Sequence, residues 1–148
     1  IRYSVASRGL GDVYKRQSQH ARVLTGGSTL IVAAQANPEK EKPLRDLGHE
    51  VIVLPNASGK VDLAALMQEL GRRQINELHV EAGFKLNGSL IREGCVDELL
   101  VYLAPTLLGD AQRMFNLPPL ESLEHKKNLT FHEVKQIGAD LRILARFI

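Results

Sequence analysis

The chain has 148 residues, of which 44% are hydrophobic, and its formal net charge is +2. Most of this positive charge comes from residues 1–17, so the remainder is slightly acidic and offers no basic face for nucleic acid. The length favours one domain, and no uncharged run reaches the roughly 18 apolar residues of a membrane span. Cys95 is the only cysteine, which excludes an internal disulfide and favours the reducing cytoplasm.

Residues 1–17 show neither helical nor alternating apolar periodicity, and we expect them to be an unstructured leader. They lack the apolar stretch of a secretory signal and the amphipathic stripe of a transit peptide. Residues 12–17 resemble the translation of a transposase end sequence used in sequencing libraries, which suggests an artefact. We therefore expect the natural sequence to begin near Ser18, inside a domain.

The next part of the chain alternates between strand and helix signals. Short β-branched runs predict strands over residues 28–34 and 49–54, with a short helical turn over 43–47 between them. A helix with one apolar stripe follows over residues 62–70, capped by its first residue, and Gly71 should end it.

The second half continues this alternation and ends in a hairpin. Its predicted elements are strands over residues 77–81, 97–104, 130–137 and 141–147, and a helix over residues 84–93. Strands that alternate with helices and finish in a hairpin predict an α/β domain whose mixed sheet is flanked by helices.

The strongest candidate for a ligand-binding site in this sequence is the turn within Val80–Ser89. Glu81 ends a predicted strand, and Gly83 opens the next helix. A helix N-terminus presents free N–H groups and partial positive charge, so a phosphate can dock there, with Lys85 adding charge. A structural interpretation stays open and is favoured by spacing alone: Gly83 would permit a tight turn, and the two charged side chains would be solvated.

Other reactive residue types form no catalytic or metal-binding set. Cys95 has no base beside it in the sequence, and we expect it to be a small buried hydrophobe. The histidines lack zinc-ligand spacing, so we expect them to be structural or surface residues, with a general-acid role left open for His79. The histidines are His20, His49, His79, His125 and His132. The absence of a nucleophile or metal site favours chemistry done by a bound cofactor.

Two segments, Val80–Asp110 and Phe131–Ile143, resemble the reductase domain of the bifunctional riboflavin biosynthesis deaminase/reductase family. The resemblance implies that residues 18–148 are the C-terminal portion of a dihydrofolate-reductase-like domain truncated at its N-terminus. It also implies NADPH-dependent reduction of 5-amino-6-(5-phosphoribosylamino)uracil to the ribitylamino product, by hydride transfer to C1 of the ring-opened sugar. No deaminase activity is expected, because one cysteine cannot supply the zinc-deaminase signature.

The resemblance also implies site residues, although none is assigned as catalytic. Glu81 corresponds to an acid that contacts the substrate, and Ser18 to a serine near the cofactor, although Gln17 replaces the acid usual before it. Phe84 departs from the usual glycine or proline. The residues implied to hold the NADPH phosphates are Gly83, Phe84, Lys85, Leu86, Asn87, Gly88 and Ser89.

Two alternatives remain. One is a non-catalytic α/β dimerisation module whose terminal strands pair with a second copy. The other is a dihydrofolate-reductase-like enzyme that acts on another pterin or pyrimidine. In the reductase interpretation the partner is the phosphorylated ribosylaminopyrimidine, no nucleic acid or membrane is involved, a homodimer is open, and the expected compartment is the cytoplasm.

Overall fold

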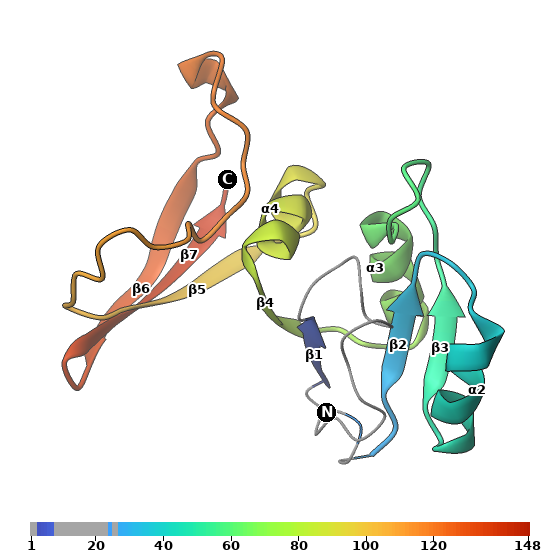
Figure 1. The fold of residues 1–148 in the computed structure, drawn as a ribbon. Helices are drawn as coiled ribbons and strands as arrows, with labels where there is room; N and C mark the ends of the chain where they lie inside the picture. Colours follow the sequence, from blue (N-terminus) through green and yellow to red (C-terminus); the bar gives the residue numbers. More distant parts are fainter. Residues whose placement is uncertain (1–2, 8–23, 25–26) are drawn as a thin grey trace.

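The computed structural model describes residues 3–7, 24 and 27–148. In Figure 1, β2, β3, α2 and α3 lie at one end, the strands β5, β6 and β7 lie at the other, and α4 lies between them. No helix in the described ranges is long and apolar enough to cross a membrane. The elements are β1 (Tyr3–Ser7), β2 (Leu30–Ala33), α2 (Pro38–Asp46), β3 (Glu50–Val53), α3 (Leu63–Arg72), β4 (Leu78–Ala82), α4 (Phe84–Arg92), β5 (Glu98–Leu103), the 3-10 helix η2 (Leu123–His125), β6 (Leu129–Ile137) and β7 (Asp140–Phe147).

The strands form parallel and antiparallel pairs, as the α/β prediction requires. Strands β1 and β4 are parallel, β2 and β3 are parallel, and β5, β7 and β6 form an antiparallel sheet in that order. Among the described residues, these strands form three separate hydrogen-bonded sheets. The mixed α/β class itself is confirmed.

Strand β1 lies in the segment for which the sequence predicts no regular structure. Its backbone pairs with β4 in register from Tyr3 opposite Leu78 to Ser7 opposite Ala82. The expectation of an unstructured leader is therefore wrong for residues 3–7, since main-chain hydrogen bonds can hold a short strand without apolar periodicity. Residues 8–17 lie outside the described part of the chain, and the natural start near Ser18 stays a prediction.

Helix α2 begins earlier than the predicted turn over residues 43–47. The Asn37 side chain accepts a hydrogen bond from the Lys40 amide at 3.2 Å, and the Glu41 carboxylate accepts one from the Asn37 amide at 2.8 Å. Pro38 occupies the first turn, where its missing N–H costs nothing. These caps start the helix at Pro38, so that Pro43 lies inside it rather than at its beginning.

Helix α3 confirms its predicted cap and extends past its predicted end. The Asp62 carboxylate accepts a hydrogen bond from the Ala65 amide at 2.8 Å. The helix continues through Gly71 to Arg72, and Gln74 takes a φ of 62° just beyond it. Gly71 therefore does not end the helix, because the left-handed residue that turns the chain comes later.

The core lies between α3, α4 and the parallel strands. Its buried members Val61, Leu63, Leu86 and Leu90 pack with partly buried residues of β2 and β4, among them Val32 and Val80. Packing of α4 against this core holds its first turn in a fixed place at the end of β4.

A cluster of charges ties the end of α3 to β3. The Arg73 guanidinium donates to both carboxylate oxygens of Glu50, at 2.5 and 2.7 Å, and to Glu69 at 2.7 Å. The hydrogen bond from Arg73 lowers the pKa of the Glu50 carboxyl below its ordinary value of 4.5. All three side chains keep part of their surface in water, so these ion pairs contribute only modestly to the free energy of unfolding.

Replacing Arg73 with leucine should lower the free energy of unfolding by about 1 kcal/mol at neutral pH. Because the folded-state pKa of Glu50 is depressed, the stabilisation is present above pH 4.5 and is lost as the pH falls below that value. Urea unfolding at pH 7 and pH 3 should therefore show a difference between the two proteins that shrinks in acid. The more exposed Arg72, changed to leucine, is the control and should have a smaller effect; an equal effect would contradict the assignment.

Candidate functional site

The turn between β4 and α4 presents an acid beside a helix N-terminus. Leu78, Val80 and Ala82 of β4 are half-buried, whereas His79 and Glu81 alternate with them and are exposed. The Glu81 side chain is 77% exposed, and Gly83 follows with extended backbone angles before α4 begins at Phe84. The strand thus points an accessible carboxylate away from the core, three residues before the helix begins at Phe84.

The beginning of α4 differs from the other α-helices in the described ranges. Asn37 and Asp62 cap α2 and α3 with their side chains, whereas Gly83 provides no side-chain cap to α4. Like α3, α4 has no acid in its first turn. The first backbone hydrogen bond of helix α4 is donated by the Asn87 amide to the Gly83 carbonyl, at 3.0 Å. The amides before Asn87 therefore have no helical acceptor and can donate to an anion.

Among the described residues, space is open at Gly83. A Cβ added to Gly83 would meet no heavy atom of the described part of the chain within 4 Å. The Lys85 side chain is exposed, and Phe84 is half-buried. An anion can therefore approach the backbone at Gly83, with a lysine beside it.

The remaining predicted cofactor residues have other contacts. Leu86 is buried in the core. The Asn87 side-chain amide donates to the Ala82 carbonyl at 3.1 Å, and the Ser89 hydroxyl accepts from Arg92 at 2.9 Å. Gly88 is buried against the backbone of Asn116. The structure brings these residues to one helix turn, but their contact with cofactor phosphates stays a prediction, and Ser18 lies outside the described residues.

Sequence reasoning missed a pairing next to Glu81. Nε2 of His79 lies 3.6 Å from Oε1 of Glu81, and both side chains are exposed on the same face of β4. The spacing i, i+2 in a predicted strand was the available signal, because such residues share a face. His79 does alternate with its neighbours as predicted, and it can accompany Glu81 in contact with a ligand.

Two other reactive groups lie apart from this turn. Cys95 packs against the core but is partly buried rather than buried as predicted, and burial, ahead of nearby negative charges, raises the pKa of its thiol. A raised pKa leaves less thiolate, so Cys95 is a poor nucleophile. His49 is buried, and neither of its ring nitrogens has a hydrogen-bond partner among the described residues.

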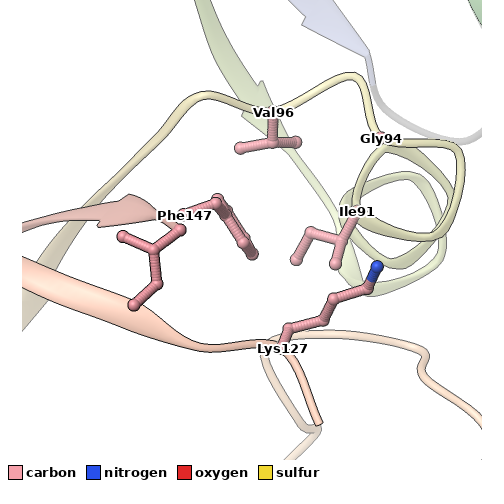
Figure 2. A pocket seen from close by; sticks show the side chains of 6 residues that line it. Ile91, Gly94, Val96, Lys127 and Phe147 are labelled. Atoms are coloured by element: carbon pink, nitrogen blue, oxygen red, sulfur yellow. The ribbon is translucent and has the colours of Figure 1, made fainter. Parts of the chain in front are cut away.

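A cavity of about 220 Å³ lies at the opposite end of α4 from the Glu81 turn. Figure 2 shows its mostly apolar lining, in which Lys127 is the one charged side chain that the described residues contribute. The lining residues are Ile91, Gly94, Val96, Lys127, Phe147 and Ile148. This cavity is therefore separate from the carboxylate and the open amides.

The sequence matches the RibD C-terminal domain family over residues 12–143. The chain belongs to this family. It is 45% identical over 91 residues to the riboflavin biosynthesis protein RibD of Escherichia coli K12, covering 61% of this chain and 25% of that protein. It is 30% identical over 94 residues to the 5-amino-6-(5-phosphoribosylamino)uracil reductase of Buchnera aphidicola from Acyrthosiphon pisum, covering 63% and 45% of the two proteins.

The structure resembles that of Acinetobacter baumannii RibD with a TM-score of 0.74 and 26% identity, covering 98% of this chain and 37% of that one. The predicted dihydrofolate-reductase-like fold and the RibD resemblance are confirmed. The chain spans 25% of the E. coli relative's length. The family match also begins at residue 12, inside the segment expected to be a leader.

Proposed function

We propose that this chain takes part in the NADPH-dependent reduction of 5-amino-6-(5-phosphoribosylamino)uracil to its ribitylamino product. Membership of the RibD C-terminal domain family supports the proposal, as does similarity to a relative named for this reductase activity. The observation that carries it is the uncapped, accessible start of α4 beside the exposed carboxylate of Glu81. The start of α4 can bind the cofactor, and Glu81 can contact the substrate.

The residues at this turn fit a dinucleotide phosphate. Gly83 leaves the backbone accessible, the first-turn amides can donate, and Lys85 adds a positive charge without an acid in the same turn. NADPH, when bound, supplies the hydride for the reduction. The task of this chain is to hold its phosphates, through Gly83, Phe84 and Lys85, so that the donor faces the sugar.

Glu81 and His79 suit the substrate. A carboxylate accepts hydrogen bonds from sugar hydroxyls and stabilises a positive charge that develops on an iminium. Glu81 is exposed enough to do either, and His79 lies close enough to orient it. Holding both reactants in line is the main source of acceleration in such a site, because orientation alone can supply several kcal/mol of the barrier.

Titration of NADPH into the purified chain tests the cofactor proposal. Saturable quenching of NADPH fluorescence, or a melting temperature that rises with ligand, is the expected result. NADH is the comparison ligand, because it lacks the 2′-phosphate and should bind more weakly if Lys85 and the amides of α4 recognise that group. No saturable change with NADPH would contradict the proposal and favour the non-catalytic module.

We also propose that the chain pairs with a second copy, in the cytoplasm, where its lone cysteine stays reduced. The sheet β5–β7–β6 has one face of apolar residues, among them Leu103, Phe131 and Val134, which are 54%, 69% and 53% exposed. Its other face carries the ion pairs of Arg142 with Glu133 and of Arg146 with Glu98. An uncharged apolar face is self-complementary, as a twofold interface requires.

Sedimentation of the chain at rising concentration should show a dimer. Changing Phe131 to lysine should shift it toward monomer, because a charge cannot be buried unpaired in such an interface. Lys135, on the other face of β6, changed to alanine, is the control and should leave the mass unchanged. A monomer at all concentrations would contradict the pairing without affecting the cofactor proposal.

A further inference from the structure

A short segment after β5 crosses α4 next to the candidate site. We call residues 114–116 the strap. The Asn116 amide donates to the Phe84 carbonyl at 3.0 Å, and the Arg92 guanidinium donates to the Asn116 carbonyl. The strap is therefore attached to the first and the last turns of α4.

Gly88 forms the seat of the strap. It lies midway between the two attachment points, and a Cβ added to it would lie 2.7 Å from the Asn116 nitrogen. Real Cβ contacts are not that short, and the atoms in the way belong to backbone, which cannot swing aside as a flexible side chain can. The absence of a side chain at Gly88 is thus what allows the strap to lie on the helix.

Asn87 links the strap to the turn that carries Glu81. Its side-chain nitrogen donates to the Ala82 carbonyl at 3.1 Å and to the Met114 carbonyl at 3.4 Å. The two N–H groups of one amide suffice for both bonds. Ala82 follows Glu81 directly and is the last residue of β4, so Asn87 joins the end of the strand, the first turn of α4 and the strap.

We infer that Asn87 is a positioning residue that, with Gly88 as the seat of the strap, fixes the β4–α4 turn. This inference rests on the proposed function, since the turn carries both Glu81 and the amides offered to the cofactor. A misplacement of about 1 Å at such a site is enough to weaken binding and turnover strongly. Asn87 and Gly88 then affect the cofactor through the backbone they hold rather than by touching it.

Two substitutions, each with a matched control, test the inference. Asn87→Ala removes both side-chain bonds, and Asn76→Ala is its control, because Asn76 is exposed and has no side-chain hydrogen bond in the described part of the chain. Gly88→Ala places a Cβ against the strap, and Gly71→Ala in α3 is its control, because a Cβ there meets no atom of the described residues within 4 Å. Alanine favours a helix more than asparagine or glycine does, so a loss cannot be ascribed to a weaker helix.

The first measurement is hydrogen exchange at the Asn116 amide, followed by NMR in the intact chain. Both test variants should exchange about tenfold faster than wild type, because the bond to Phe84 is no longer held closed. The second is the NADPH dissociation constant, measured well below the melting temperature, where a merely structural role would leave it unchanged. It should rise about fivefold in both test variants and stay within about twofold in the controls.

Unchanged exchange at Asn116 would overturn the inference, and so would faster exchange with unchanged NADPH affinity. Failure of the wild-type chain to bind NADPH would instead refute the proposed function. In that case the exchange measurement alone decides whether Asn87 and Gly88 hold the strap, so that the two failures are distinguishable.

Discussion

Exchanging Glu81 for glutamine should lower turnover about 100-fold in a full-length enzyme that carries this segment. Glutamine keeps the size of the side chain but loses the negative charge that would attract an iminium, and it offers one acceptor oxygen to the sugar hydroxyls instead of two. The side chain is largely exposed and is not part of the core, so the fold should be unaffected. Affinity for NADPH should change by no more than about twofold, because the phosphates are held beyond Gly83.

The measurement compares steady-state turnover with the NADPH dissociation constant for the same variant. Glu77, which is exposed just before β4, is the matched control, and its change to glutamine should leave both quantities unchanged. Equal losses of turnover and cofactor affinity in Glu81→Gln would show that this carboxylate does not act on the substrate.

Replacing Gly83 with valine should raise the NADPH dissociation constant about tenfold or more. Valine fits the described part of the chain without strain, since Gly83 has extended backbone angles and no atom of the described residues lies within 4 Å of an added Cβ. Its branched side chain would occupy the space through which a phosphate must approach the amides of Phe84 and Lys85. The substitution therefore separates ligand binding from stability.

Thermal unfolding of Gly83→Val should match wild type, while a fluorescence titration reports the loss of affinity. The NADPH affinity of Gly83→Ala should lie between those of wild type and Gly83→Val, because a methyl group blocks less space than the valine side chain. Ala57→Val adds a branched side chain to an exposed loop and serves as the control. Unchanged affinity in Gly83→Val would remove the phosphate site from this turn.

The sequence predicts the parts of the fold that depend on neighbours along the chain. Asp62 caps α3 as its side chain requires, Gly83 opens α4, and the alternation around Val80 places Glu81 on the exposed face. The terminal hairpin also forms as predicted, with Gly138 taking a positive φ in its turn. These features depend on local hydrogen bonds and on the alternation of apolar and polar residues. Both can be recognised in the sequence itself.

Contacts between distant segments could not be predicted in this way. The sequence near Gly88 does not indicate that the Asn116 backbone will lie on it. The sequence of residues 3–7 does not indicate that they pair as a parallel strand with β4. The proximity of Glu50 to Arg73 likewise depends on how α3 packs beside β3. The resemblance assigns Asn87 to the cofactor, which stays a prediction, and for the same reason it could not indicate that the Asn87 side chain contacts the end of β4 and the strap.

The seat at Gly88 also constrains how this chain can change over evolution. Any residue larger than glycine there requires the backbone at 116 to move, so the two positions are coupled although they are remote in sequence. Insertions and deletions between β5 and β6 are free to accumulate before or after residues 114–116, where the side chains are mostly exposed. An alignment of relatives should place length variation on both sides of this short stretch and spare the stretch itself.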